Sequence, residues 1–106
     1  MRKTARIWDF MANMKPKMWK LVLDVLKPHD PHLPEFATKL ASLCSVDGVN
    51  VTSVEIDKDT ETVKVTIVGK LNYSEIRATI EEWGGVIHSV DEVVTGTKPV
   101  PQLMSL

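Results

Sequence analysis

Acidic side chains on expected β-strands are the features of this 106-residue chain most able to do chemistry. Asp24 interrupts an otherwise apolar segment, and Asp91 and Glu92 stand together in a later one. Glu55 and Asp57 are two residues apart, so on one strand their side chains share a face. Carboxylate oxygens are the ligands that calcium and other hard cations take. These five residues therefore suggest a divalent-cation site.

The negative charge of such carboxylates can be balanced in two ways, and a bound cation is one of them. If the strands that contain Asp24 and Asp91 are neighbours, they lie about 4.8 Å apart, and like charges facing each other there are destabilising. Lys20 or Lys64 would compensate the two acids as an ion pair, without any ligand. A calcium ion would do so by taking about six to eight oxygen ligands. The spacing is not that of an EF-hand, and both alternatives stay open.

The three histidines give a weaker signal. His29 and His32 flank a proline turn, and His88 alternates with valines, which predicts a packed, hydrogen-bonded side chain. The usual zinc spacing on one helix face is missing. As a candidate metal ligand, His88 ranks below the carboxylates. Metal-assisted hydrolysis with His29 or His88 as the base is the least favoured function.

The elements that must position these residues alternate as strand, helix, strand, strand, helix, strand. Apolar residues repeat every second position in the expected strands and at helical spacing in the expected helices. The predicted elements are strands at 19–26, 49–57, 62–68 and 86–94, with helices from Pro34 to the turn at Asp47-Gly48 and from Asn72 to Gly84-Gly85. This order predicts an α+β fold, the ferredoxin-like βαββαβ sandwich, with a four-stranded antiparallel sheet and two helices on one face.

Three segments are expected. Residues 1–17 form a basic leader that is either disordered or forms a short helix lined by Ile7, Trp8, Phe10, Met11 and Met14. Residues 18–96 form the domain, and residues 97–106 form an irregular tail. Within the domain, the helical spacing predicts that Cys44 is a small buried hydrophobe.

Composition and charge exclude several classes of function. Residues 1–20 hold six basic side chains and one acidic, whereas residues 21–106 hold seven basic and thirteen acidic, so we expect no nucleic-acid binding by the folded domain. No apolar run approaches the roughly 20 residues of a membrane span. The single cysteine suits a reducing cytoplasm, so we expect a cytoplasmic location.

Motifs of the known activities of this fold are missing as well. The expected third strand has no aromatic residue on which an RNA base would stack. The loop at residues 27–34 has no arginine for phosphate and no paired cysteines for copper. The face of the sheet without helices should instead expose Val22, Leu26, Val68 and either Ile87 or Val90, which favours self-association.

Long strings of this sequence resemble an archaeal family known as domain of unknown function 211. They are LDVLKPH from residue 23, GVNVT from residue 48, EID from residue 55 and GGVIHSVDEVV from residue 84. The resemblance covers residues 18–96 and implies a ferredoxin-like fold, ring-shaped homo-oligomers and bound calcium, with no established activity.

The leading hypothesis is therefore a non-enzymatic ring oligomer without an organic cofactor. Its divalent-cation ligands would be Asp24, Glu55, Asp57 and Asp91, followed by Glu92 and His88. The alternative is a regulatory module that senses a small molecule at a subunit interface. In that case the loop at residues 27–34 and the start of the following helix would hold a ligand carboxylate.

Overall fold

The structure is a computed structural model that describes residues 17–98, 100 and 101. Its elements, in chain order, are β1 (Lys17–Pro28), α2 (Leu33–Ala41), β2 (Val46–Ile56), β3 (Thr60–Leu71), α3 (Tyr73–Glu82) and β4 (Val86–Gly96). The predicted order of elements is confirmed. The predictions for the leader fall on residues outside the described ones, as do those for most of the tail.

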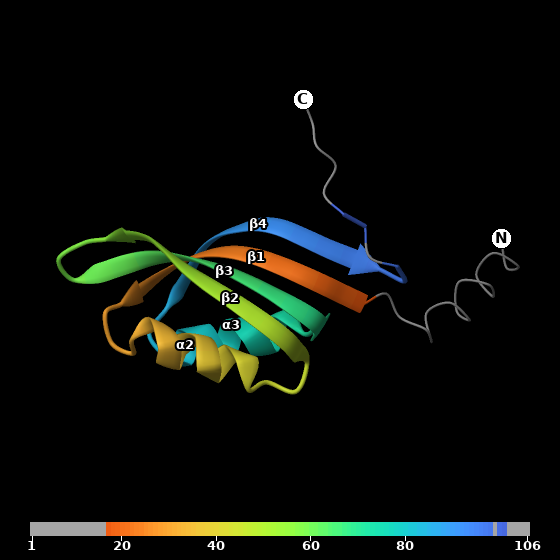
Figure 1. Ribbon diagram of the computed structural model, residues 1–106, viewed down its shortest axis with the longest axis horizontal. Helices are drawn as coiled ribbons and strands as arrows, with labels where there is room; N and C mark the ends of the chain where they lie inside the picture. The colour runs from red at the N-terminus through yellow and green to blue at the C-terminus, as the bar shows by residue number, and fades with distance from the viewer. Residues whose placement is uncertain (1–16, 99, 102–106) are drawn as a thin grey trace, which may run out of the picture.

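The four strands form one antiparallel sheet in the order β2-β3-β1-β4. Both helices lie on one face of this sheet, and no helix of the described residues lies on the opposite face, which we call the open face (Figure 1). The predicted ferredoxin-like α+β architecture is therefore confirmed. No helix in the described part of the chain is long and apolar enough to cross a membrane.

The core lies between the sheet and the helices. The period of two in β1 turns Leu21, Leu23 and Val25 toward the helices, where each is almost completely buried. The other buried hydrophobic residues come from both helices and the inner strands: Phe36, Leu40, Val46, Val63, Val65, Ile67, Leu71, Ile76 and Ile80. The same alternation turns Lys20, Val22, Asp24 and Leu26 to the open face.

The first helix is shorter than predicted. It ends at Ala41, and the backbone N–H of Ser42 donates to the carbonyls of Thr38 and Lys39. The chain then turns toward β2, so that Leu43 packs against the core while Cys44 is exposed. The prediction that Cys44 is buried was wrong, because it continued the helical spacing past the real end of the helix.

The register of β4 is irregular. Its pairing with β1 shifts at three places: between Met18 and Lys20, between Val22 and Leu23, and between Asp24 and Val25. These shifts leave Asp91 and His88 without a residue directly opposite. Each such bulge interrupts the alternation of side chains between the two faces.

Because of these bulges, the side chains of β4 that lie on the open face differ from those predicted. Val90 is opposite Leu23 and Ile87 is opposite Val25, so both face the helices. Val86 instead faces outward, opposite Leu26. The prediction of Ile87 or Val90 on the open face was therefore wrong.

Candidate functional site

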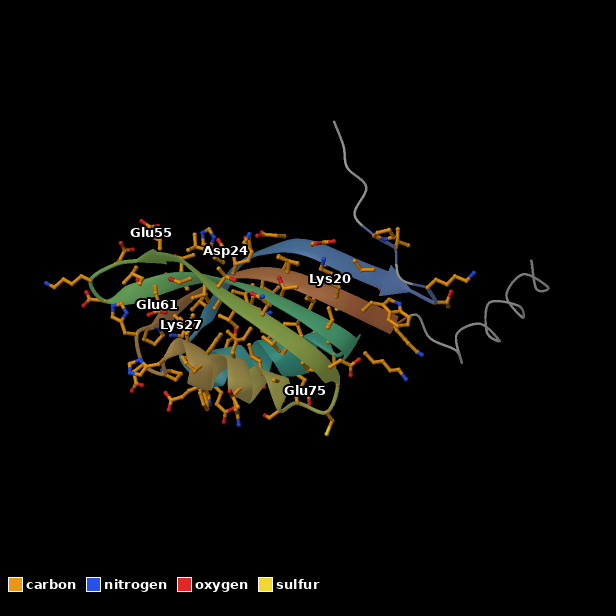
Figure 2. All side chains as sticks on the ribbon, viewed as in Figure 1. Lys20, Asp24, Lys27, Glu55, Glu61 and Glu75 are labelled. Carbon is orange, nitrogen blue, oxygen red and sulfur yellow. The ribbon has the colours of Figure 1, made fainter. Side chains whose placement is uncertain are left out.

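Three of the five acidic side chains that the sequence singled out, Asp24, Asp91 and Glu92, meet on the open face. Figure 2 labels Asp24 and Lys20 of this region. Two ion pairs join the strands there, Lys64 Nζ with Asp91 Oδ2 at 2.7 Å and Lys20 Nζ with Glu92 Oε1 at 3.3 Å. In addition, the His88 ring nitrogen Nδ1 lies 3.6 Å from Asp24 Oδ2. We call these six residues the charged cluster.

Lys64 connects the two aspartates of this cluster. It stands opposite Asp24 in the pairing of β1 with β3, and its ammonium group reaches Asp91 on β4. The hydrogen bond to Asp91 raises the pKa of Lys64, and the nearby charge of Asp24 adds to this effect. The hydrogen bond from Lys64 lowers the pKa of Asp91, as does a second bond from the Ser89 hydroxyl at 2.7 Å. The ion-pair alternative is thus the arrangement that the structure contains.

The bulges of β4 decide which side chains join the cluster. Asp91 and Glu92 were predicted on opposite faces, but both reach the open face, because Asp91 occupies a bulge. His88 was predicted to be packed, but its side chain is 75% exposed beside Asp24. Both predictions were wrong for the same reason, since they assumed an uninterrupted alternation.

Glu55 and Asp57 lie apart from the charged cluster. Glu55 is opposite Thr62 near the end of β2, and Asp57 follows β2 in the turn to β3, where its backbone N–H donates to the Thr60 carbonyl. Both side chains are exposed. The structure therefore does not bring the four favoured carboxylates together within one chain.

The described residues of a single chain form no ready-made group of metal ligands. Among the described residues, no three histidine, cysteine, aspartate or glutamate side chains are grouped so that they could hold a metal. The carboxylates of the charged cluster already have protein cations beside them. A divalent ion at Asp24 and Asp91 would have to displace Lys64 and take further ligands from elsewhere.

A second polar group, around Lys27, was missed by the sequence analysis. Lys27 is only 1% exposed, and its Nζ donates to the Pro28 carbonyl at 2.8 Å. Glu61 Oε1 lies 3.6 Å from that Nζ, and the ring centroid of Phe36 lies 5.6 Å from it. Figure 2 shows Lys27 and Glu61 at the end of the sheet near the β2–β3 turn. The sequence did contain a signal for the burial of Lys27, because this residue continues the series of buried alternate positions in β1.

His29 completes this group and links two loops. Its Nδ1 lies 3.0 Å from Glu61 Oε2, and its Nε2 lies 3.0 Å from the backbone carbonyl of Lys58. Both partners are hydrogen-bond acceptors, so this arrangement favours the imidazolium form, in which both ring nitrogens donate. The Glu61 bond raises the pKa of His29, and the same bond lowers the pKa of Glu61. With both nitrogens occupied, His29 has no free nitrogen with which to act as a base.

The stabilisation from His29 is expected to fall as pH rises through the raised folded pKa of His29, because its imidazolium then loses the proton. The folded pKa is raised above the usual 6.5, so this stabilisation is complete below 6.5 and is lost as pH rises through the folded pKa. Urea denaturation between pH 5 and 9, compared with His29→Gln, measures the effect. Identical pH profiles for the two proteins would show that His29 contributes nothing to this dependence.

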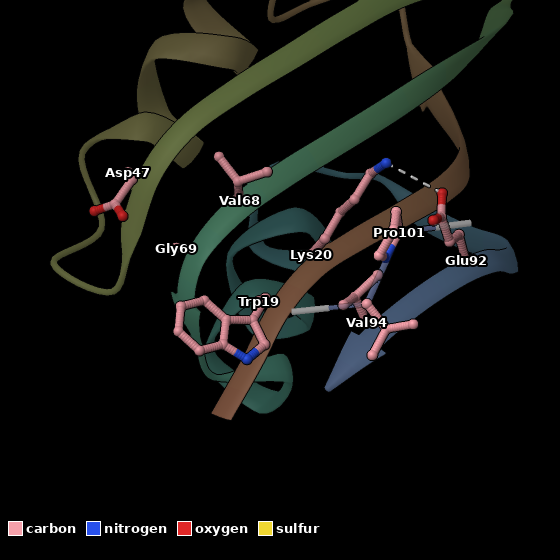
Figure 3. A pocket seen from close by; sticks show the side chains of 9 residues that line it. Trp19, Lys20, Asp47, Val68, Gly69, Glu92, Val94 and Pro101 are labelled. Carbon is pink, nitrogen blue, oxygen red and sulfur yellow. Dashed lines mark ion pairs between the residues drawn. The ribbon is translucent and has the colours of Figure 1, made fainter. Parts of the chain in front are cut away.

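A groove of about 510 Å³ opens on the open face beside the charged cluster (Figure 3). Its walls combine an indole ring, aliphatic side chains and charged groups, and its lining residues include Trp19, Lys20, Asp47, Val68, Glu92 and Val94. Trp19 is held in place by a hydrogen bond from its Nε1 to the Gly96 carbonyl, at 2.9 Å. The groove has room for a small molecule.

Comparison with known proteins agrees with the fold and with the resemblance of the sequence. The family DUF211, described as "Uncharacterized ArCR", matches residues 19–105. This match extends beyond residue 96, where the resemblance noted in the sequence ends. The uncharacterized protein MJ0319 of Methanocaldococcus jannaschii is 54% identical over 85 residues, which cover 79% of this chain and 88% of that protein. The chain therefore belongs to the uncharacterised family DUF211.

Proposed function

We propose that the protein is a homo-oligomeric assembly protein, and not an enzyme, whose subunits associate through the open face and the edges of the sheet. The observation that carries this proposal is the exposure of large apolar side chains on the open face. Leu26 is 39% exposed, Val68 is 41% exposed and Val86 is 58% exposed. Apolar side chains gathered on one face favour a partner that covers them.

The charges of the open face are compatible with such contact. The charged cluster pairs Lys20 with Glu92, Lys64 with Asp91 and His88 with Asp24. Burying a charge is costly when it lacks a partner. Glu92 and Asp91 have lysine partners within their own subunit, and Asp24 lies opposite Lys64. A second subunit can therefore cover the face without leaving a lone charge behind.

The sheet edges supply the direction of assembly. β2 and β4 are both eleven residues long and form the two edges of the sheet. A contact between the β4 edge of one subunit and the β2 edge of the next joins two different surfaces, and such contacts close into a ring when the rotation per subunit allows. This agrees with the ring that the family resemblance implies.

We place a divalent cation, with calcium as the first candidate, at the junction of subunits in this proposal. Asp24 and Asp91 would supply carboxylates from one subunit, with Glu92 and His88 beside them. Glu55 and Asp57 stand exposed near the other edge of the sheet, where a neighbouring subunit meets them. Ligands from two subunits would provide the oxygen count that one chain lacks.

Native mass spectrometry tests the assembly and the cation together. We expect a defined oligomer for the unmodified protein and a smaller species for Leu26→Lys with Val86→Lys, because the new charges would be buried at the interface. Ile56→Lys is the matched control, since Ile56 is 68% exposed but points to the helix side, opposite Glu61. Spectra with calcium and with EDTA, for the unmodified protein and for Asp24→Asn with Asp91→Asn, report the bound ion.

The outcomes separate the two parts of the proposal. A monomer at all concentrations would overturn assembly. An oligomer that takes up no calcium-sized mass, or the same mass in the asparagine variant, would remove the cation at Asp24 and Asp91 but leave assembly standing.

A second candidate function, sensing of a small molecule, is favoured by the groove of about 510 Å³ (Figure 3). The groove lies on the open face, so in an oligomer its ligand would lie at a subunit interface. Its lining does not include the loop at residues 27–34, where the sequence analysis had placed the ligand carboxylate. An organic mass retained by the oligomer, and lost on Trp19→Ala, would favour sensing over simple assembly.

A further inference from the structure

Two β-bulges lie at the end of the sheet where the groove of about 510 Å³ opens (Figure 3). Trp19 has no residue opposite it in the pairing of β1 with β3 or with β4, and Asp47 has none in the pairing of β2 with β3. Each is an additional residue of its strand, and both line the groove. Bulges aim side chains in this way and are common next to active sites.

The glycines of this region leave space above the sheet. Gly69 lines the groove, and Gly48 lies on β2 opposite Val68, another lining residue. Gly69 has a positive φ, whereas Gly48 does not, and a methyl group at Gly48 would only meet Val68 Cγ2 at 3.6 Å. Nothing in its own backbone therefore requires glycine at position 48. A glycine inside a strand often marks a place where a ligand or another backbone approaches closely.

The Trp19 ring is a wall of the groove that attracts cations. Its Nε1 donates to the Gly96 carbonyl at 2.9 Å, which fixes the orientation of the ring. The ammonium group of Lys17 lies 5.6 Å from the ring centroid, so a cation can reach the indole. Lys17 is exposed, and a ligand cation can displace it from the ring.

The charges of the groove leave one carboxylate for a ligand. The lining residues include one base, Lys20, and two acids, Glu92 and Asp47. Lys20 and Glu92 form an ion pair at 3.3 Å, so they balance each other. Asp47 is exposed, and no ion pair within the described part of the chain includes it. The groove is therefore negative on its β2 side.

We propose that this groove binds a small organic cation, an alkylamine or alkylguanidine, whose charged group lies between the Trp19 ring and the Asp47 carboxylate. β1 and β2 flank β3, so their backbones lie about 10 Å apart and leave room for such a group between the two side chains. The aliphatic part of the ligand would lie along Val68. This inference rests on the second candidate function, sensing by the groove, and does not depend on assembly.

Isothermal titration calorimetry of the full chain with n-butylguanidinium and n-butylurea tests the assignment, because the two probes share a shape and differ in charge. We expect the guanidinium to bind about tenfold more tightly or better, since only it forms a charged contact with Asp47. Asp47→Asn should remove this preference. Trp19→Leu, which keeps an apolar side chain but removes the ring, should weaken binding of the guanidinium.

Asp59→Asn is the matched control. It removes the same charge from the turn between β2 and β3, at the other end of β2 from Asp47, and should bind both probes like the unmodified protein. Equal affinities for the two probes, or equal losses in Asp59→Asn and Asp47→Asn, would overturn the assignment of a cation. Asp47 is exposed, so Asp47→Asn is expected to keep the fold even if Trp19→Leu does not.

The outcome for this ligand is separate from the outcome for sensing. Binding of both probes with equal affinity, lost in Trp19→Leu, would overturn the cation but support a groove that senses a neutral molecule. A neutral organic mass retained in native mass spectra would do the same. Binding of neither probe would overturn the proposed ligand, and the native mass spectra would then decide whether sensing stands.

Discussion

Gly69→Ala is expected to destabilise the protein by about 3 kcal/mol or more, which combines backbone strain with a steric clash. Gly69 has φ of +150°, a conformation that L side chains rarely adopt. A methyl group there would also collide with the backbone of the neighbouring strand, at the Ser45 carbonyl and 2.8 Å from the Asp47 nitrogen. Backbone atoms of a paired strand cannot move aside without breaking the pairing of β2 with β3.

Gly48→Ala is the matched control, because Gly48 lies on β2 in the same part of the sheet. A methyl group at Gly48 would meet Val68 Cγ2 at 3.6 Å, which is an ordinary contact. Its effect should be within about 1 kcal/mol. Urea denaturation of both variants measures the difference, and equal midpoints would contradict the expected role of the Gly69 backbone.

Glu61→Gln is expected to cost about 3–5 kcal/mol, because it removes the counter-charge of a buried lysine. The side chain of Lys27 has no exposed surface, and Glu61 is the anion beside its ammonium group. The Pro28 carbonyl and the Phe36 ring would remain, and neither carries a charge. The same substitution also removes the acceptor of His29 Nδ1, so the link between the two loops weakens as well.

Lys27→Met should cost much less than Glu61→Gln. Methionine fills the apolar space of the lysine stem, and Glu61 keeps the imidazolium of His29 as its partner. The double variant should recover part of the stability lost in Glu61→Gln, because no buried ammonium group then lacks an anion. Chemical denaturation of the three variants forms a thermodynamic cycle. Additive effects would show that Lys27 and Glu61 do not depend on each other.

The two polar groups of the molecule suggest different roles. The group around Lys27 is largely enclosed and joins the β1–α2 loop to the β2–β3 turn, so its contribution is to stability. The charged cluster lies on the open face, where a partner or an ion can reach it. Variants of Asp24 and Asp91 are therefore expected to affect association more than folding.

The sequence by itself determined the order of the elements, because the signals for them are local. The alternation of Leu21, Leu23 and Val25 defines a strand with one buried face, and it holds in the structure. The start of α3 is equally local, since Asn72 accepts a hydrogen bond from the backbone N–H of Glu75, three residues later. The sequence strings also identified the family.

The tertiary structure decided which side chains meet. The bulges of β4 turned Asp91 to the same face as Glu92 and exposed His88, and a bulge arises from pairing with a neighbouring strand. His29 and Glu61 are 32 residues apart and meet only when β1 pairs with β3. Periodicity describes one segment at a time, whereas a site is made where segments distant in sequence come together. The elements were therefore predictable from the sequence, and the composition of the site was not.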